Sequence, residues 1–159
     1  MGVDAEKAFD RLQRGYLFQV METFGFPEEF INLVKTTYKS TIAQVLTNGI
    51  PSGSFSLSRG TAQGDPLSPS LFALGIEPLA QKIRETEGIK GIRVGGKEYK
   101  LSLYADDLLL YLNNANTSIP HVIEKITDFS QISGYKMNVN KTALFPINNV
   151  DKLIINNLK

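Results

Sequence analysis

The sequence predicts an α+β domain, in which short strands are combined with amphipathic helices. Apolar and aromatic residues form two short runs at positions 99–104 and 107–112, which is typical of strands. Only two residues separate these runs, so we expect a tight hairpin between them. By contrast, apolar side chains recur every three or four positions over residues 12–24, which predicts a helix ended by Gly25.

The remaining elements follow in chain order. A second helix is expected from Pro27, because two glutamates are favourably placed in its first turn. Turn residues at 48–53 predict a hairpin that joins segments 42–46 and 54–58. The later elements expected are a helix after the polar loop at 59–66, a strand at 91–94 with a turn at 95–96, a helix between the polar loop at 113–118 and Gly134, and an edge strand at Leu144 and Phe145.

The composition limits the possible functions. The chain has 17 Lys plus Arg against 16 Asp plus Glu, a net charge of +1, so no strong basic surface attracts nucleic acid. The absence of Cys excludes disulfides, thiolate zinc sites and cysteine nucleophiles. His121 has no nucleophilic motif nearby and is expected on the surface. The apolar runs are much shorter than a membrane span, so we expect no membrane partner.

Two carboxylates lie together at the centre of the predicted hairpin. Ala105 and Asp106 occupy the bend, and Asp107 opens the return strand. Like charges this close repel unless a cation lies between them, so a divalent metal is the natural candidate. Asp is also a favoured turn residue, and the pair alone fits an ordinary bend. If the short apolar run that ends at Asp4 lies beside the hairpin, three Asp side chains converge and could hold Mg²⁺ or Mn²⁺.

Four sequence blocks in a fixed order carry a resemblance to a known family. They are residues 4–10 (DAEKAFD), 63–69 (QGDPLSP), 104–107 (YADD) and 133–142 (SGYKMNVNKT). With these blocks the chain resembles the palm of reverse transcriptases from non-LTR (LINE-type) retrotransposons. Each block alone is weak or moderate support, whereas four in family order are a strong signal.

The resemblance implies a fold and a domain organisation. The fold would be a ferredoxin-like β-α-β-β-α-β sheet with helices on one face. Residues 1–147 would form a partial palm, followed by a C-terminal tail at 148–159. The fingers and thumb of such polymerases do not fit in this chain, so we expect the isolated fragment to polymerise weakly or not at all.

The resemblance also implies an activity. The family's enzymes are RNA-directed DNA polymerases, which join a dNTP to a primer 3′-hydroxyl by two-metal nucleotidyl transfer. The implied cofactor is Mg²⁺, with Mn²⁺ possible, and the implied partners are an RNA template, a DNA primer and the missing regions of the parent polyprotein. Such elements copy themselves at chromosomal DNA, which implies the nucleus.

Site residues are carried over from the matching blocks. Asp4 and Asp106 would hold both metal ions, with Asp107 beside them. Lys141 matches a basic residue that neutralises or protonates departing pyrophosphate, although a solvent-facing lysine fits equally well. Phe9 matches the aromatic that excludes a 2′-hydroxyl, although its spacing also fits a core aromatic.

Other matching positions would bind nucleotide or template. They are the backbone of Ala5, the loop residues Gln63 and Gly64, and Tyr104 before the Asp pair. One departure is Ala62, where many relatives carry a basic residue, and this weakens the expectation of a phosphate contact there.

Two rival functions remain open from the sequence. The chain could be a non-catalytic truncated relic or a domesticated interaction module, although the intact Asp4, Asp106, Asp107, Gln63 and Gly64 argue against long decay at the site. It could also be a palm-like nucleotidyl cyclase, but the loop at Gln63 favours a templated polymerase.

Overall fold

The computed structural model describes residues 1–62 and 64–147, and it confirms the α+β class. Its helices are α1 (Ala8–Arg11), α2 (Arg14–Thr23), α3 (Glu28–Tyr38), α4 (Ser68–Glu85) and α5 (Ala115–Ser133). Its strands are β1 (Gly2–Val3), β2 (Ile42–Ala43), β3 (Leu46–Thr47), β4 (Ile50–Pro51), β5 (Phe55–Ser56), β6 (Ile92–Val94), β7 (Lys97–Tyr99), β8 (Leu101–Tyr104) and β9 (Asp107–Leu110). The tail predicted at 148–159 lies outside the described residues.

The central sheet has the order β1-β9-β8 and is antiparallel throughout. Val3 of β1 pairs with Leu108 of β9, and Leu108 in turn pairs with Leu103 of β8. On the free side of β1, the segment after α5 forms two isolated antiparallel bridges, Gly2 with Ala143 and Ala5 with Met137. β1 therefore lies between β9 and the segment after α5.

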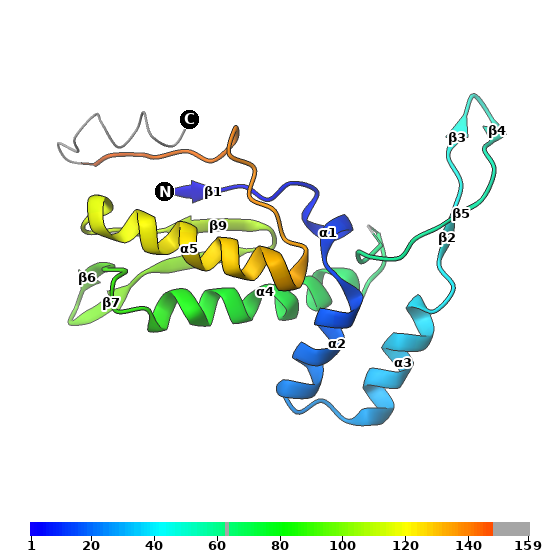
Figure 1. Ribbon diagram of the computed structural model, residues 1–159, viewed down its shortest axis with the longest axis horizontal. Helices are drawn as coiled ribbons and strands as arrows, with labels where there is room; N and C mark the ends of the chain where they lie inside the picture. Colours follow the sequence, from blue (N-terminus) through cyan, green and yellow to red (C-terminus); the bar gives the residue numbers. More distant parts are fainter. Residues whose placement is uncertain (63, 148–159) are drawn as a thin grey trace.

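The sheet has one buried face and one exposed face. Val3, Leu108 and Leu110 are at most 2% exposed, whereas Leu109, between the last two, is 41% exposed. Side chains alternate across a strand, so the buried set shares one face. Helices α4 and α5 lie side by side against that face (Figure 1), with α4 also contacting β8. The buried face of the sheet is therefore the one that packs against α4 and α5.

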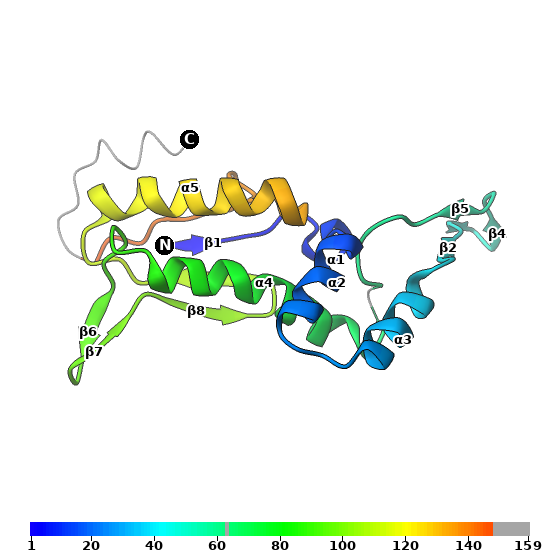
Figure 2. The same cartoon turned by 60° about the horizontal axis from the view of Figure 1, so that its bottom comes forward.

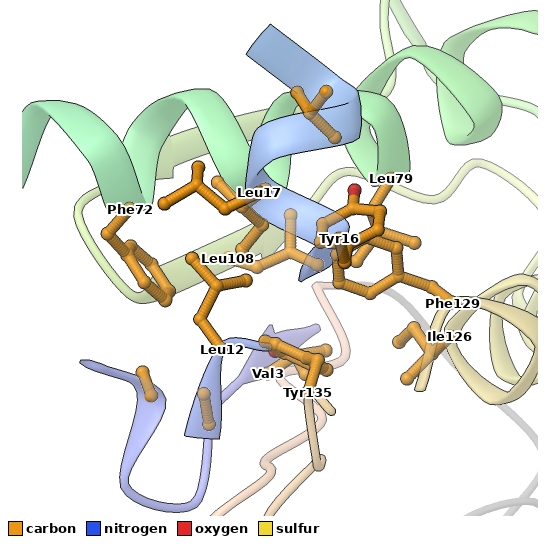
Figure 3. Packing of buried hydrophobic residues seen from close by; sticks show 14 of the residues in the cluster. Val3, Leu12, Tyr16, Leu17, Phe72, Leu79, Leu108, Ile126, Phe129 and Tyr135 are labelled. Carbon is orange, nitrogen blue, oxygen red and sulfur yellow. The ribbon is translucent and has the colours of Figure 1, made fainter. Parts of the chain in front are cut away.

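The core is a continuous cluster between the helices and this buried face. Tyr16 and Leu17 of α2, Leu79 of α4 and Phe129 of α5 meet in it, as Figure 3 shows. The hydroxyl of Tyr16 donates to the Gly75 carbonyl at 2.9 Å, so the buried phenol is satisfied. Each such apolar side chain contributes about 1.5–3 kcal/mol when fully buried.

The termini of α5 follow from local chemistry. The Asn114 side chain accepts from the Thr117 amide and caps the start, and Gly134 ends the helix at a φ of 76°. The helix begins at Ala115, so the loop expected at 113–118 is shorter than predicted, because the asparagine at its start acts as the cap. The edge strand expected at Leu144 and Phe145 is also corrected, because the nearest pairing to β1 is the single bridge at Ala143.

Two hairpins extend away from the core, as Figures 1 and 2 agree. One, the distal arm, comprises residues 42–56, where β2 pairs with β5 and β3 with β4. The other joins β6 to β7, with Val94 opposite Lys97. The distal arm confirms the hairpin that turn residues predicted, although it pairs in two short pieces rather than as one continuous ladder. The second hairpin confirms the strand at 91–94 and the turn at 95–96, and it adds the strand β7, which was not predicted separately.

Candidate active site

The turn between β8 and β9 has the geometry that the sequence predicts. Tyr104 and Asp107 are the last cross-strand pair, so Ala105 and Asp106 alone make the bend. Ala105 has a φ of 51°, a left-handed conformation that a side chain adopts at some steric cost. Asp107 is exposed, whereas Asp106 is half-buried. Backbone pairing therefore directs the two neighbouring carboxylates into different surroundings.

Asp4 follows β1 at the same end of the sheet. Its neighbour Val3 pairs with Leu108, next to Asp107, so the chain brings Asp4 beside the β8–β9 turn as expected. The Asp4 carbonyl accepts from the Asn138 amide at 2.8 Å, and the Glu6 amide donates to the Lys136 carbonyl at 2.8 Å. These bonds fix the backbone of Asp4 between β9 and the segment after α5.

The three Asp side chains do not converge as closely as expected. In the described part of the chain, no three His, Cys, Asp or Glu residues are grouped so that they could hold a metal ion. Asp107 lies on the exposed face of β9 together with Leu109, whereas Asp106 belongs to the turn. Asp4 and Asp106 nevertheless lie near enough for both charges to act on one buried group, Tyr135.

Tyr135 lies on the core side of this end of the sheet, and sequence reasoning assigned it no separate role. It is 5% exposed and packs against Phe129, with ring centroids 5.5 Å apart. Burial first, and then the charges of Asp4 and Asp106, raise the pKa of the Tyr135 phenol, so the group stays protonated. The sequence signals were its place directly after the glycine that ends α5 and its position within the block at 133–142.

An ion-pair network connects the first and last sequence blocks. Glu6 accepts from Lys136 at 2.7 Å and from Arg11 at 3.0 Å. The hydrogen bond from Lys136 first, and then that from Arg11, lower the pKa of Glu6. The network therefore connects Lys136, after α5, with Glu6 before α1 and with Arg11 at the end of α1.

Phe9 and Ala5 both contact other parts of the fold, but each keeps one group that these contacts do not occupy. The Phe9 ring packs on Phe72 of α4 at 4.7 Å and is only half-buried, so one part of the ring contacts the core. Ala5 is buried and bridges Met137, but the two hydrogen bonds that flank this bridge use groups of Asp4 and Glu6. The Ala5 carbonyl is therefore not consumed by that pairing.

The loop before α4 agrees with its expected chemistry. Gly64 has a φ of 89°, so the freedom expected of this glycine is used, whereas Gln63 lies outside the described residues. The Asp65 carboxylate accepts from the Leu67 amide at 2.9 Å, in the turn just before α4. It also accepts from the Tyr38 hydroxyl at 3.4 Å, which connects α3 to this loop.

The last two expected site residues are exposed. Tyr104 is 83% exposed on the outer face of β8, and Lys141 lies in a short turn closed by bonds from the Lys141 and Thr142 amides to the Asn138 carbonyl. This turn interrupts the pairing with β1 directly after Asn138. His121 is half-exposed beside Glu124 on α5, which confirms a surface position.

A cavity of mixed charge lies next to these elements. It has a volume of about 530 Å³ between residues 6–14 and the segment 55–62. Arg14 in its wall donates to the carbonyls of Leu57, Tyr38 and Gly60 at 2.7–3.1 Å. Sequence reasoning missed Arg14, because no local pattern indicates an arginine that binds three distant carbonyls.

Comparison with known proteins identifies the family. The family model described as reverse transcriptase (RNA-dependent DNA polymerase) matches residues 1–154. The chain belongs to the reverse transcriptase family. This reverse transcriptase chain is 32% identical to the Pol polyprotein of the type-2 retrotransposable element R2DM of Drosophila melanogaster, over 87% of its own length and 13% of the polyprotein. These findings support a non-LTR, LINE-type reverse transcriptase domain.

Two further relatives show how this reverse transcriptase chain relates to longer and shorter proteins. It is 34% identical to the Transposon TX1 149 kDa protein of Xenopus laevis, over 69% of this chain and 8% of that protein. It is 42% identical to the mitochondrial protein AtMg01250 of Arabidopsis thaliana, over 39% of this chain and 55% of that protein. The chain thus spans a small part of the polyproteins that it matches. None of the helices in residues 1–62 and 64–147 has the length and apolarity needed to cross a membrane.

Proposed function

We propose that residues 1–147 are the catalytic palm of a retrotransposon RNA-directed DNA polymerase, with a ferredoxin-like β-α-β-β-α-β sheet. The segment after α5, β1, β9 and β8 follow one another in an antiparallel arrangement, which supports this topology. Fingers and thumb regions of a longer polyprotein would complete the enzyme, which accords with the small share of its relatives that the chain covers. RNA template, DNA primer and dNTP are the proposed substrates.

One observation carries the proposal more than any other. The β8–β9 turn presents Asp106 and Asp107 beside the strand that leads to Asp4. Carboxylate oxygens suit Mg²⁺ or Mn²⁺. When bound, two such ions activate a primer 3′-hydroxyl and stabilise departing pyrophosphate. Asp4 and Asp106 would bind both ions, with Asp107 beside them.

The other expected residues take positioning roles around this centre. Phe9 would contact the sugar of the incoming nucleotide with the part of its ring that Phe72 leaves open. The Ala5 carbonyl and the loop at Gln63 and Gly64 would bind nucleotide or template. Tyr104 would contact nucleic acid from the exposed sheet face, and Lys141 would meet pyrophosphate.

Metal binding by the purified 159-residue chain tests the proposal directly. Electron paramagnetic resonance with Mn²⁺ should detect binding that Asp4→Asn and Asp106→Asn each weaken by at least tenfold. Asp128→Asn is the matched control, because Asp128 is an exposed carboxylate on α5 that lies beside Lys125. Equal Mn²⁺ affinity in the wild type and both site variants would refute the proposed metal centre. A primer-extension assay should give weak or no synthesis by the isolated chain.

A further inference from the structure

The β6–β7 hairpin concentrates positive charge in a chain that is almost neutral. Residues 90–100 have a net charge of +3, because four cationic side chains stand against the single carboxylate of Glu98. The whole chain has a net charge of +1, so all its other residues together carry −2. The four cations are Lys90, Arg93, Lys97 and Lys100. The near-neutral total that argued against a basic surface therefore hides a local one.

Three of these cations are not neutralised by a neighbouring carboxylate. Lys90, Arg93 and Lys97 are exposed, and none of them forms an ion pair with another residue of 1–62 or 64–147. Lys100 is engaged with the fold instead, since its ammonium group donates to two backbone carbonyls at the end of α4, at 2.7 and 2.9 Å. Three positive charges on this hairpin are therefore available to an anionic partner.

One face of the hairpin also exposes apolar side chains. Ile92 pairs with Tyr99 across the two strands, and Val94 pairs with Lys97. Directly paired side chains lie on the same face of a sheet, so these four share one side of the hairpin. Ile92, Val94 and Tyr99 are 39%, 60% and 48% exposed, and the hairpin extends away from the core in Figure 2. An aromatic ring therefore lies open beside a lysine.

The base of the hairpin is fixed to the rest of the fold. The Lys90 amide donates to the Ser118 hydroxyl at 3.1 Å, and the Lys90 carbonyl accepts from the Asn113 amide at 2.9 Å. The Glu98 carboxylate accepts from the Gly91 amide at 2.8 Å and so closes the hairpin near its base. These bonds hold the hairpin against the start of α5, and the exposed face is presented from a fixed base.

This combination of groups suits single-stranded nucleic acid better than a protein. Proteins that bind single strands join cations, which attract phosphates, to aromatic rings on which bases stack. The buried centre of a protein interface is by contrast depleted of lysine, because burying an unpaired charge is costly. The family model that matches this chain describes an RNA-dependent polymerase, so RNA is the strand we consider.

We propose that the β6–β7 hairpin binds single-stranded RNA, with a base stacked on Tyr99 and a phosphate at Lys97. Lys90 and Arg93 add to the attraction for the strand. β8 begins at Leu101, next to this hairpin, and ends at the turn that holds the Asp pair, so the RNA surface lies at the opposite end of β8 from the candidate active site.

Fluorescence anisotropy of a labelled CA-repeat RNA of about 12 nucleotides with the purified chain tests the stacking part of the proposal. Tyr99→Ile should weaken binding about five- to tenfold, because isoleucine keeps an apolar, strand-forming side chain but has no aromatic face. Tyr99→Phe is the matched control and should stay within about twofold of the wild type, since its ring can still stack. Equal affinity in the wild type, Tyr99→Ile and Tyr99→Phe would overturn the proposal and would leave the apolar face as a protein contact.

A charge reversal tests the phosphate contact. Lys97→Glu should weaken RNA binding at least about threefold and reduce its salt dependence. Lys39→Glu makes the same change in net charge at an exposed position at the end of α3, and it should weaken binding less than about twofold. Equal losses in these two variants would mean attraction by net charge alone and would overturn a defined surface.

The RNA surface does not depend on the proposed metal centre, and the two can fail separately. Mn²⁺ affinity should be the same in Tyr99→Ile and in the wild type, because Tyr99 lies on β7 and not at the β8–β9 turn. A loss of both RNA and Mn²⁺ binding in Tyr99→Ile would indicate a general disturbance of the fold and would overturn the specific role of the hairpin.

Discussion

The central sheet and the distal arm are built from similar short antiparallel strands, but their surroundings differ. Leu108 and Leu110 of β9 are at most 2% exposed against the helices, whereas Leu46 and Ile50 of the arm are 70% and 73% exposed. Strand pairing alone contributes little in water, so a hairpin is held firmly only where one face is buried. The candidate site therefore lies on the central sheet, whose strands have buried side chains, and not on the exposed arm.

The two regions are joined by few polar contacts. Arg14 donates to the carbonyls of Tyr38 and Leu57, at either end of the arm. The arm also closes at its base, where β2 pairs with β5. The difference teaches that β9 is supported by burial of Leu108 and Leu110, while the arm depends on contacts at its base.

The largest expected effect comes from removing core volume behind the turn. Leu108→Ala should lower the free energy of unfolding by about 2–5 kcal/mol, because it leaves a cavity beside Val3. Ile50→Ala in the arm should change it by less than about 0.5 kcal/mol. Denaturant unfolding followed by circular dichroism measures both. Equal losses would mean that the arm is as tightly packed as the sheet.

A pair of glycines compares the two regions through backbone geometry. Gly60 and Gly49 have φ values of 81° and 80°, so alanine is strained at both, by about 1–2 kcal/mol. At Gly60 a Cβ atom would also meet the Asp10 carbonyl oxygen at 2.7 Å, whereas at Gly49 nothing lies within 4 Å. Gly60→Ala should therefore cost about 1–3 kcal/mol more than Gly49→Ala. Thermal unfolding of both variants checks the difference, and equal costs would contradict the close contact at Gly60.

The connection between the regions can be weakened by Arg14→Met. The loss of the bonds to the carbonyls of Leu57, Tyr38 and Gly60 should cost about 1–2 kcal/mol. Hydrogen exchange should rise in residues 38–60 and stay unchanged in β8 and β9. Arg93→Met, at an exposed site on β6, is the control. A uniform rise across the whole chain would contradict a local connection.

The smallest effect concerns Glu6 and depends on pH. Because its ion pairs lower the pKa of Glu6 in the folded chain, their contribution is fully present above the ordinary value of 4.5 and is lost as pH falls through the lowered folded value. Glu6→Gln should therefore melt at a lower temperature than the wild type at pH 7. The difference should shrink at pH 3, as thermal melts at both pH values can measure. A difference that stays constant or grows toward pH 3 would contradict the ion-pair role.

Sequence patterns predicted the elements that depend on neighbouring residues. The bend at Ala105 and Asp106, the helix after Pro27 and the end of α5 at Gly134 are confirmed. Each depends on turn or capping chemistry within a few residues, which a local pattern contains. The start of α5 was misjudged, because Asn114 reads equally well as a loop residue or as a cap.

Contacts between residues far apart in the chain could be predicted less well from the sequence. The sequence indicated that Asp4 and the Asp106 turn are neighbours only through the family resemblance, and it gave no role to Tyr135 or Arg14. The close convergence expected of three carboxylates is not found among the described residues.

By itself, the sequence determined the α+β class, the family and the turn that holds the Asp pair. Those features follow from composition, periodicity and motifs that are written within short segments. Only the tertiary structure decided which side of β1 the segment after α5 occupies, which carboxylates lie near Tyr135 and how Arg14 holds the arm. These are contacts between residues far apart in the chain, and they form because burial and hydrogen bonding are satisfied by the whole fold at once.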